Sequence, residues 1–236
     1  MDAATRTAVT DEAIAQIGDM VVSGRLAPGE RLPREHLLAA DLGLSRNSLR
    51  EAVRALTMVN VLESRQGDGT YVTSLDPALL TEGMGLALDV FQHHRRAEVF
   101  ELRRVLESAA AGLAAARATC DEIVEMRALA EALWPTDTLD DALGADLALH
   151  RRIGEASGNA VLSALVGSVT ARAFGAGTWD DANVNRDWLV AAREDHLSIV
   201  EAMDRRDPEL ARASMLRHLE HAERWAQLAD DRIAGV

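Results

Sequence analysis

The sequence predicts a mainly α-helical protein of two domains: an N-terminal winged helix-turn-helix, with three helices and a β-hairpin wing, and a C-terminal antiparallel all-helical bundle. Apolar residues recur at helical spacing over most of the 236 residues. Two short strand-like runs lie between residues 61 and 73, and no strand signal follows Pro77. We therefore expect domains at residues 1–75 and 76–236.

Caps and turns predict the first three helices. Thr10 is the expected N-cap of the first helix. Pro33 suits the first turn of the second helix, and Gly43 suits the position just after its end. Ser45 is expected to cap a third helix that runs to about Met58. The short gap between the second and third helices is typical of a helix-turn-helix.

The wing and the bundle follow from a change of period. "NVLESRQGDGTYVTS" predicts strands over 61–64 and 70–73 around a tight turn at 66–69. Beyond Pro77 we expect a bundle with Asn159 as an N-cap and breaks that include Pro135. Its helices are expected at 77–92, 96–118, 121–133, 139–157, 159–174, 186–204 and 207–230.

Charge is distributed unevenly along the chain. The net charge is −13, but residues 1–75 carry eight Arg against ten acidic residues, a net charge of −2. Residues 31–65 hold six Arg against four acidic residues, and the chain has no lysine. DNA contacts must therefore come from Arg, hydroxyls, amides and backbone N–H groups.

The remaining composition indicates a cytoplasmic protein. No run approaches the roughly 20 apolar residues of a membrane span, so no membrane partner is expected. The N-terminal stretch carries acidic residues where an export signal has a basic start. Cys120 is the one cysteine, which excludes an intramolecular disulfide, and we expect it to be a small buried residue.

The third predicted helix is the candidate DNA reader. In a helix-turn-helix the second helix of the motif lies in the major groove, and its N-terminal residues face the base edges. Here those residues are Arg46, Asn47, Ser48 and Arg50. Arg suits guanine and Asn suits adenine. The alternative is a solvated, serine-capped helix face, but the turn, cap and wing in this order favour DNA.

The stretch from Gly24 to Val72 resembles the winged-helix domain of GntR-family bacterial transcription regulators. The matching pieces are "LAPGERLP", "LGLSRNSLREAVRAL" and "GDGTYV". The resemblance implies operator contacts from the four residues of the third helix and places the wing tip, Gln66 and Gly67, in the minor groove. His36 stands where the family usually has an arginine that contacts DNA, so this contact is weakened or depends on protonation. Asn60 replaces a usual glycine, and Asn tolerates the left-handed backbone.

Four titratable residues lie on apolar stripes of the predicted bundle. Asp146 and His150 are one helical turn apart, and His196 and His218 lie in line with apolar residues of two further helices. For each histidine alone, the alternative is a hydrogen-bonded core residue. Because an unpaired buried polar group costs about 1–3 kcal/mol, all four together favour a shared cation. Three imidazoles and one carboxylate suit Zn²⁺ first, with Ni²⁺ or Mn²⁺ as alternatives, and leave one or two coordination positions open.

Residues 77–236 resemble the FCD effector domain of the FadR-type branch of the GntR family. In that domain a metal is often held by one Asp and three His, and the pattern carries over to Asp146, His150, His196 and His218. "FELRRVLES" resembles the helix that lines the effector pocket, which makes Arg103 the candidate effector-binding residue. A local ion pair between Arg103 and Glu107 is an equally good interpretation. Beside an open metal position, a guanidinium would bind a small carboxylate.

The residues and the resemblance together predict a homodimeric transcription regulator that binds an inverted-repeat operator in double-stranded DNA and responds to a small carboxylate. The resemblance implies a repressor that the effector releases, which is the commoner mode in the family. A metal-dependent enzyme acting on an organic acid is a second hypothesis, because such a metal site can activate water. We expect no enzyme, since the sequence places no separate Glu, Asp or Ser beside the cluster as a base. A regulator with a purely structural metal is the third hypothesis.

Overall fold

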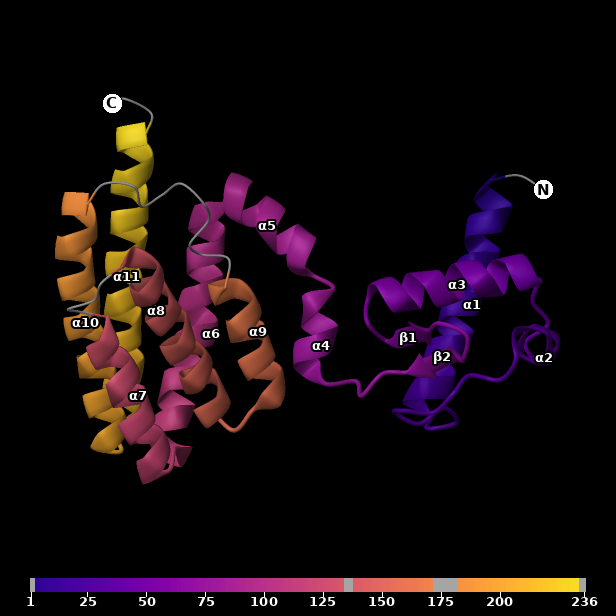
Figure 1. Ribbon diagram of the computed structural model, residues 1–236, viewed down its shortest axis with the longest axis horizontal. Coiled ribbons are helices and arrows are strands. Elements are labelled where there is room, and N and C mark those ends of the chain that lie inside the picture. Colours follow the sequence, from indigo (N-terminus) through magenta and orange to yellow (C-terminus); the bar gives the residue numbers. More distant parts are fainter. Residues whose placement is uncertain (1–2, 134–137, 172–181, 234–236) are drawn as a thin grey trace. The chain divides into compact units, whose positions relative to one another are not determined.

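The computed structural model describes residues 3–133, 138–171 and 182–233, and the chain divides into two compact units between Met84 and Gly85. Both units are built mainly of helices, and the first also contains a two-stranded hairpin (Figure 1). This arrangement confirms the predicted fold class of a winged helix-turn-helix followed by a helical C-terminal domain. Among the described residues, no helix combines the length and apolar character that a bilayer crossing requires.

The first unit contains four helices and the hairpin. Its elements are α1 (Ala3–Val22), α2 (Glu35–Asp41), α3 (Arg46–Met58), β1 (Leu62–Arg65), β2 (Gly69–Val72) and α4 (Pro77–Glu82). Their core is formed by one fully buried side chain or more from each of the first five elements. Examples are Ile17, Leu38, Leu49, Leu62 and Val72, each at most 2% exposed. Full burial of such a side chain contributes about 1.5–3 kcal/mol.

The turn between α2 and α3 has the predicted chemistry. Gly43 has a φ of 65°, a left-handed conformation that glycine adopts without strain. The Ser45 hydroxyl accepts a hydrogen bond from the Ser48 N–H at 3.0 Å, which confirms the predicted N-cap. Two other boundaries were wrong. The first helix begins at Ala3 rather than at Thr10, and Pro33 precedes the N-cap of α2 instead of lying in its first turn.

The hairpin has the predicted position, but each strand lies one residue closer to the turn than predicted. Its antiparallel register runs from Leu62 opposite Val72 to Arg65 opposite Gly69. The segment before α2 extends it, because the Leu32 N–H donates to the Thr70 carbonyl at 2.8 Å. Strand β2 is thus hydrogen-bonded on one side to β1 and on the other to the chain that leads into α2.

A single helix over residues 77–92 was predicted, and this prediction was wrong. Helix α4 ends at Glu82, and α5 begins at Gly85. At Gly83 an added Cβ would lie 3.2 Å from the Val59 Cα, so the chain approaches the end of α3 closely there. Asn60 has the left-handed φ of 58° that we expected, and its side-chain amide donates to the Leu79 carbonyl of α4 at 2.9 Å.

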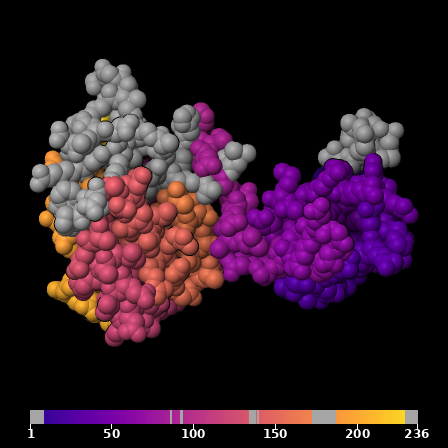
Figure 2. All heavy atoms as spheres, viewed as in Figure 1, coloured from indigo at the N-terminus to yellow at the C-terminus, as the bar shows by residue number. Residues whose placement is uncertain are grey.

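The second unit is a bundle of antiparallel helices. Its elements are α5 (Gly85–His94), α6 (Arg96–Arg117), α7 (Cys120–Ala132), α8 (Leu139–Ala156), α9 (Ala160–Thr170), α10 (Ala182–Asp204) and α11 (Pro208–Ile233). Helix α6 contacts α8, α9, α10 and α11. In the space-filling view, side chains occupy the spaces that the ribbons leave between neighbouring helices (Figure 2). The predicted N-cap is present, since the Asn159 side chain accepts from the Leu162 N–H at 3.1 Å.

Two details of the second unit differ from the predictions, and one part of the predictions lies outside the described residues. Helix α10 begins at Ala182 instead of residue 186. Cys120 is exposed at the start of α7 instead of being buried, because the Thr119 cap places it in the solvent-facing first turn. Pro135 and residues 172–174 lie outside the described residues.

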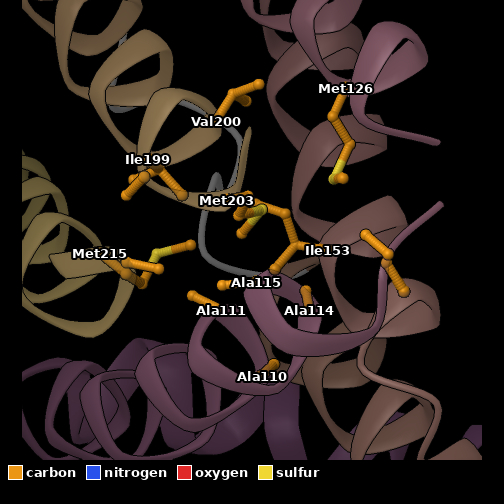
Figure 3. Close-up of a cluster of buried hydrophobic side chains, with 14 of the residues drawn as sticks. Ala110, Ala111, Ala114, Ala115, Met126, Ile153, Ile199, Val200, Met203 and Met215 are labelled. Atoms are coloured by element: carbon orange, nitrogen blue, oxygen red, sulfur yellow. The ribbon is translucent and has the colours of Figure 1, made fainter. Parts of the chain in front are cut away.

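Small residues on α6 let its neighbours come close. Ala110, Ala111, Ala114 and Ala115 are fully buried and face larger side chains from the surrounding helices (Figure 3). Those neighbours include Met126, Ile153, Ile199, Met203 and Met215. Helices pack as near as about 8 Å where the contact residues are small. The alanine face therefore places α6 within reach of polar side chains on α8, α10 and α11.

Candidate functional sites

Four polar side chains from three helices meet in the interior of the second unit. Asp146 and His150 come from α8, His196 from α10 and His218 from α11, and each is at most 2% exposed. One possible ligand atom from each lies within 4.8 Å of the others. The structure thus brings together all four residues that the apolar stripes singled out.

The spacing of these atoms suits the ligands of one metal ion. The three Nε2 atoms of His150, His196 and His218 are 3.2–3.3 Å apart. The His196 Nε2 lies 3.4 Å from the Asp146 Oδ1. Ligands bound to zinc at about 2.0–2.1 Å in tetrahedral geometry lie about 3.3 Å from one another.

Several polar atoms of this group have no hydrogen-bond partner among the described residues. Neither carboxylate oxygen of Asp146 accepts a hydrogen bond from the described residues, and the Nδ1 atoms of His196 and His218 also lack one. A buried polar atom without a partner is rare and costs about 1–3 kcal/mol, or more for a charged group. A divalent cation would compensate the Asp146 carboxylate, so the donor set fits a metal.

A fifth residue, Glu107 of α6, connects this group to Arg103. Its carboxylate accepts hydrogen bonds from the His150 Nδ1, from the Arg103 Nε at 2.6 Å and from the Thr170 hydroxyl at 3.2 Å. Burial alone would raise the pKa of Glu107, but Arg103 and His150 lower it to about 2. Glu107 is therefore ionised, and a hydrogen bond to Nδ1 leaves the Nε2 of His150 for a metal.

Arg103 is buried, and only part of its guanidinium is hydrogen-bonded to the described residues. It is 1% exposed, and its guanidinium lies 5.2 Å from the centre of the Phe100 ring. Its Nε is bound to Glu107, whereas Nη1 and Nη2 have no hydrogen-bond partner among the described residues. The ion pair with Glu107 that the sequence left as an alternative is present, and it still leaves two donors available for a ligand.

Burial and neighbouring charges shift the pKa values of the four residues in different directions. Burial, together with the charge of a neighbouring histidine, lowers the pKa of His196 and of His218 well below the ordinary value. Burial also opposes protonation of His150, but Glu107 and Asp146 raise its pKa. Burial raises the pKa of Asp146. His196 and His218 are thus neutral, which is the form that binds metals.

Three of the four predicted DNA contacts on α3 lie on the surface of the first unit, and Ser48 does not. Arg46, Asn47 and Arg50 are exposed on α3, whereas Ser48 is 9% exposed and its hydroxyl lies 2.9 Å from that of Ser45. The Arg50 Nε donates to the Glu35 carboxylate at 2.9 Å.

The other predicted contacts lie on α2 and on the hairpin. His36 is exposed on α2, and Gln66 and Gly67 are exposed in the turn between β1 and β2. The structure therefore leaves these three residues accessible to a partner, while their roles stay predictions.

Two families match the chain, and they divide it as the structure does. Residues 9–72 match the bacterial regulatory proteins of the gntR family, and residues 98–221 match the FCD domain. The chain belongs to the GntR family. Its members bind operator DNA, and FCD domains bind small-molecule effectors and often metals.

Known GntR-family proteins resemble this chain over most of its length. The Uxu operon transcriptional regulator of Escherichia coli is 29% identical, over 89% of this chain and 83% of its own length. The LutR transcriptional regulator of Bacillus subtilis is 27% identical, over 86% and 94%. The putative L-lactate dehydrogenase operon regulatory protein of E. coli is 30% identical, over 89% and 83%. This protein is thus a transcriptional regulator of the GntR type with an FCD domain.

A solved structure agrees with the fold. The GntR protein of Streptococcus agalactiae superposes with a TM-score of 0.64 at 26% identity, over 91% of this chain and 99% of that protein.

The functional residue that the sequence analysis undervalued is Glu107, considered only as a partner of Arg103. Its position on the same inward stripe, four residues after Arg103, was the available signal.

Proposed function

We propose that this regulator is a homodimeric repressor whose operator binding is controlled by a small carboxylate held at a metal site in the bundle. One observation carries the proposal: a buried Asp and three His lie beside an arginine with two unpartnered donors. In this proposal residues 1–75 read DNA, and residues 76–236 bind the effector and form the dimer.

Asp146, His150, His196 and His218 would hold a divalent transition metal. The nitrogen-rich donor set favours Zn²⁺, with Ni²⁺ or Mn²⁺ as alternatives. When bound, the metal supplies a Lewis-acidic position that accepts one oxygen of a carboxylate.

The remaining work falls to Glu107 and Arg103. Glu107 fixes the ring orientation of His150 through Nδ1 and holds Arg103 through Nε. The two Nη groups of Arg103 then form a fixed fork that matches a carboxylate, and their burial strengthens the interaction. The name of one E. coli relative refers to an L-lactate dehydrogenase operon, and lactate is an acid of this class.

The regulatory step would be a population shift. Two reading domains bind the half-sites of an inverted repeat, and the effector binds one dimer arrangement better than the other. The spacing of the reading helices then changes, and repression is relieved.

The enzyme hypothesis has less support. We expected no carboxylate beside the cluster, and this was wrong, because Glu107 contacts His150. Three donors nevertheless occupy this carboxylate, and its pKa of about 2 makes it a weak base. The relatives are regulators, which agrees with a protein that binds its effector without converting it.

The test measures binding of a duplex from the region upstream of the protein's own gene by fluorescence anisotropy. L-lactate, succinate and citrate are added to metal-loaded and chelated protein. We expect one acid to shift operator affinity of the metal-loaded protein only, and Arg103→Lys to lose this response, because lysine keeps the charge but not the fork. Retained metal with no response to any acid, together with unfolding by chelators, would identify a structural metal instead.

A further inference from the structure

The first unit contains a hollow that the predicted DNA contacts do not account for. It measures about 410 Å³ and lies between the start of α2, one side of α3 and strand β2. Its floor consists of apolar side chains, including Leu38, Leu49 and Val53. Four arginines and one glutamate line it: Arg31, Arg34, Arg50, Arg54 and Glu35.

The arginines are concentrated here against the charge of the whole domain. Residues 1–75 carry a net charge of −2 and eight arginines, and half of those arginines line this one hollow. Only one acidic residue, Glu35, lines it as well. Glu51 and Asp68 pair with arginines of this group, so its four arginines face three acidic residues and keep a small positive excess. A local positive excess is typical of a surface that binds polyanions.

The arginines are weakly held and therefore exchangeable. Arg31 pairs with Asp68 at 3.4 Å, Arg50 with Glu35 at 2.9 Å and Arg54 with Glu51 at 2.8 Å. These arginine side chains are 54–74% exposed, and exposed ion pairs of this kind contribute little to stability. Arg34 is exposed and belongs to none of the ion pairs seen in the described part of the chain.

Arg31 lies against the hairpin side of the hollow. At Gly69 an added Cβ would lie 2.7 Å from the Arg31 Nε, so a larger residue there would require this guanidinium to move. Arg31 also donates to the Asp68 carbonyl, and the chain at Leu32 is hydrogen-bonded to β2. Arg31 thus lies along the edge of the hairpin, where its exposed guanidinium can exchange Asp68 for another anion.

The position of the hollow identifies what it faces. In the DNA-reading arrangement proposed above, α3 lies in the major groove and the hairpin tip lies in the neighbouring minor groove. One sugar-phosphate backbone separates two neighbouring grooves, so it must pass between α3 and the hairpin. The hollow lies between α3 and β2.

We propose that this hollow seats that sugar-phosphate backbone, with Arg31, Arg34 and Arg54 binding its phosphates. The proposal rests on the DNA-reading role and adds residues that neither the helix-turn-helix pattern nor the wing tip singled out. Phosphate contacts position a protein on DNA and carry no sequence information. These three arginines therefore supply affinity for any duplex, while Arg50 remains a base-reading residue.

The salt dependence of DNA binding tests this. Each neutralised phosphate contributes about −0.9 to the slope of log K against log salt concentration. We expect Arg34→Gln and Arg54→Gln each to make that slope less steep by about 0.9. Across a fourfold rise in salt, wild-type affinity should then fall about 3.5-fold more than that of either variant.

The experiment uses the full chain with an upstream-region duplex and a scrambled duplex of equal length, at several salt concentrations. Arg25→Gln is the matched control, because Arg25 is an exposed arginine of the same unit that does not line the hollow. The slope and affinity of the hollow variants should fall equally on both duplexes and more than those of the control. Slopes equal to the control's, or a loss confined to the upstream duplex, would overturn the proposal.

Failure of the DNA-reading role gives a different result. Wild-type protein that binds both duplexes equally would contradict specific operator recognition, whereas the slopes on the scrambled duplex would still test the hollow. Pyrophosphate that raises the wild-type melting temperature but not that of Arg34→Gln, with DNA slopes unchanged, would assign the hollow to a small anion and overturn the proposal.

Discussion

Replacing Glu107 by glutamine tests the buried network most directly. Glutamine keeps the shape of the side chain but removes the negative charge that faces Arg103 and His150. The Arg103 charge would then remain buried with no carboxylate bonded to it. We expect the second unit to lose stability and the first unit to be unaffected.

The expected loss of unfolding free energy follows from the pKa shift of Glu107. The pKa of Glu107 is lowered from 4.5 to about 2. Since one pKa unit corresponds to about 1.4 kcal/mol, the ionised form is favoured by about 3 kcal/mol at neutral pH. Breaking a buried ion pair by removing one partner costs about 3–5 kcal/mol, which agrees. A loss of about 3 kcal/mol should lower Tm by about 6–12 °C in a unit of this size.

Tryptophan fluorescence reports on unfolding of the second unit, because all four tryptophans follow residue 84. Thermal unfolding is followed at pH 7 on chelated protein, with Glu155→Gln as the control for an exposed ion pair. A carboxyl group whose pKa is lowered on folding stabilises the folded state above about pH 4.5, and this contribution is lost as the pH falls toward 2. The difference between wild type and Glu107→Gln should therefore shrink in acid. A Tm for Glu107→Gln equal to the control's would refute this account of the network.

Three further predictions concern single side chains. Arg50→Ala should weaken specific operator binding by about 1–3 kcal/mol in a mobility-shift assay, and unchanged affinity would contradict its base-reading role. His196→Ala should abolish metal retention measured by elemental analysis, and full occupancy would rule out the proposed ligand set. Asn60→Ala should destabilise the first unit more than Asn60→Gly, by about 1 kcal/mol in urea unfolding, because glycine tolerates the φ of 58°; equal losses would show that backbone strain plays no part there.

Local chemistry explains which parts of the fold were predictable from the sequence. Caps and left-handed turns depend on one residue and its near neighbours, so Ser45, Gly43 and Asn159 were assigned correctly. The break after α4 was missed because it depends on a tertiary approach, in which Gly83 lies against the end of α3. Cys120 was expected to be buried, but it lies in the first turn of a capped helix, where an apolar residue can face solvent.

The candidate metal residues were predictable because each lies on an apolar stripe of its own helix. An inward-facing polar side chain on such a stripe needs a partner, and the sequence shows this without any tertiary information. The contact between Glu107 and His150 spans 43 residues, and no local pattern predicts it. The hollow in the first unit is likewise formed by three separate segments, which only the folded chain brings together.

The shared carboxylate of Glu107 has a thermodynamic consequence. A ligand that binds the fork of Arg103 acts on the same side chain that orients His150. Any factor by which metal tightens effector binding must equal the factor by which effector tightens metal binding. Under the proposed function, cells that accumulate the effector would retain metal in this protein at lower free-metal concentrations, so the regulator would respond to both concentrations together.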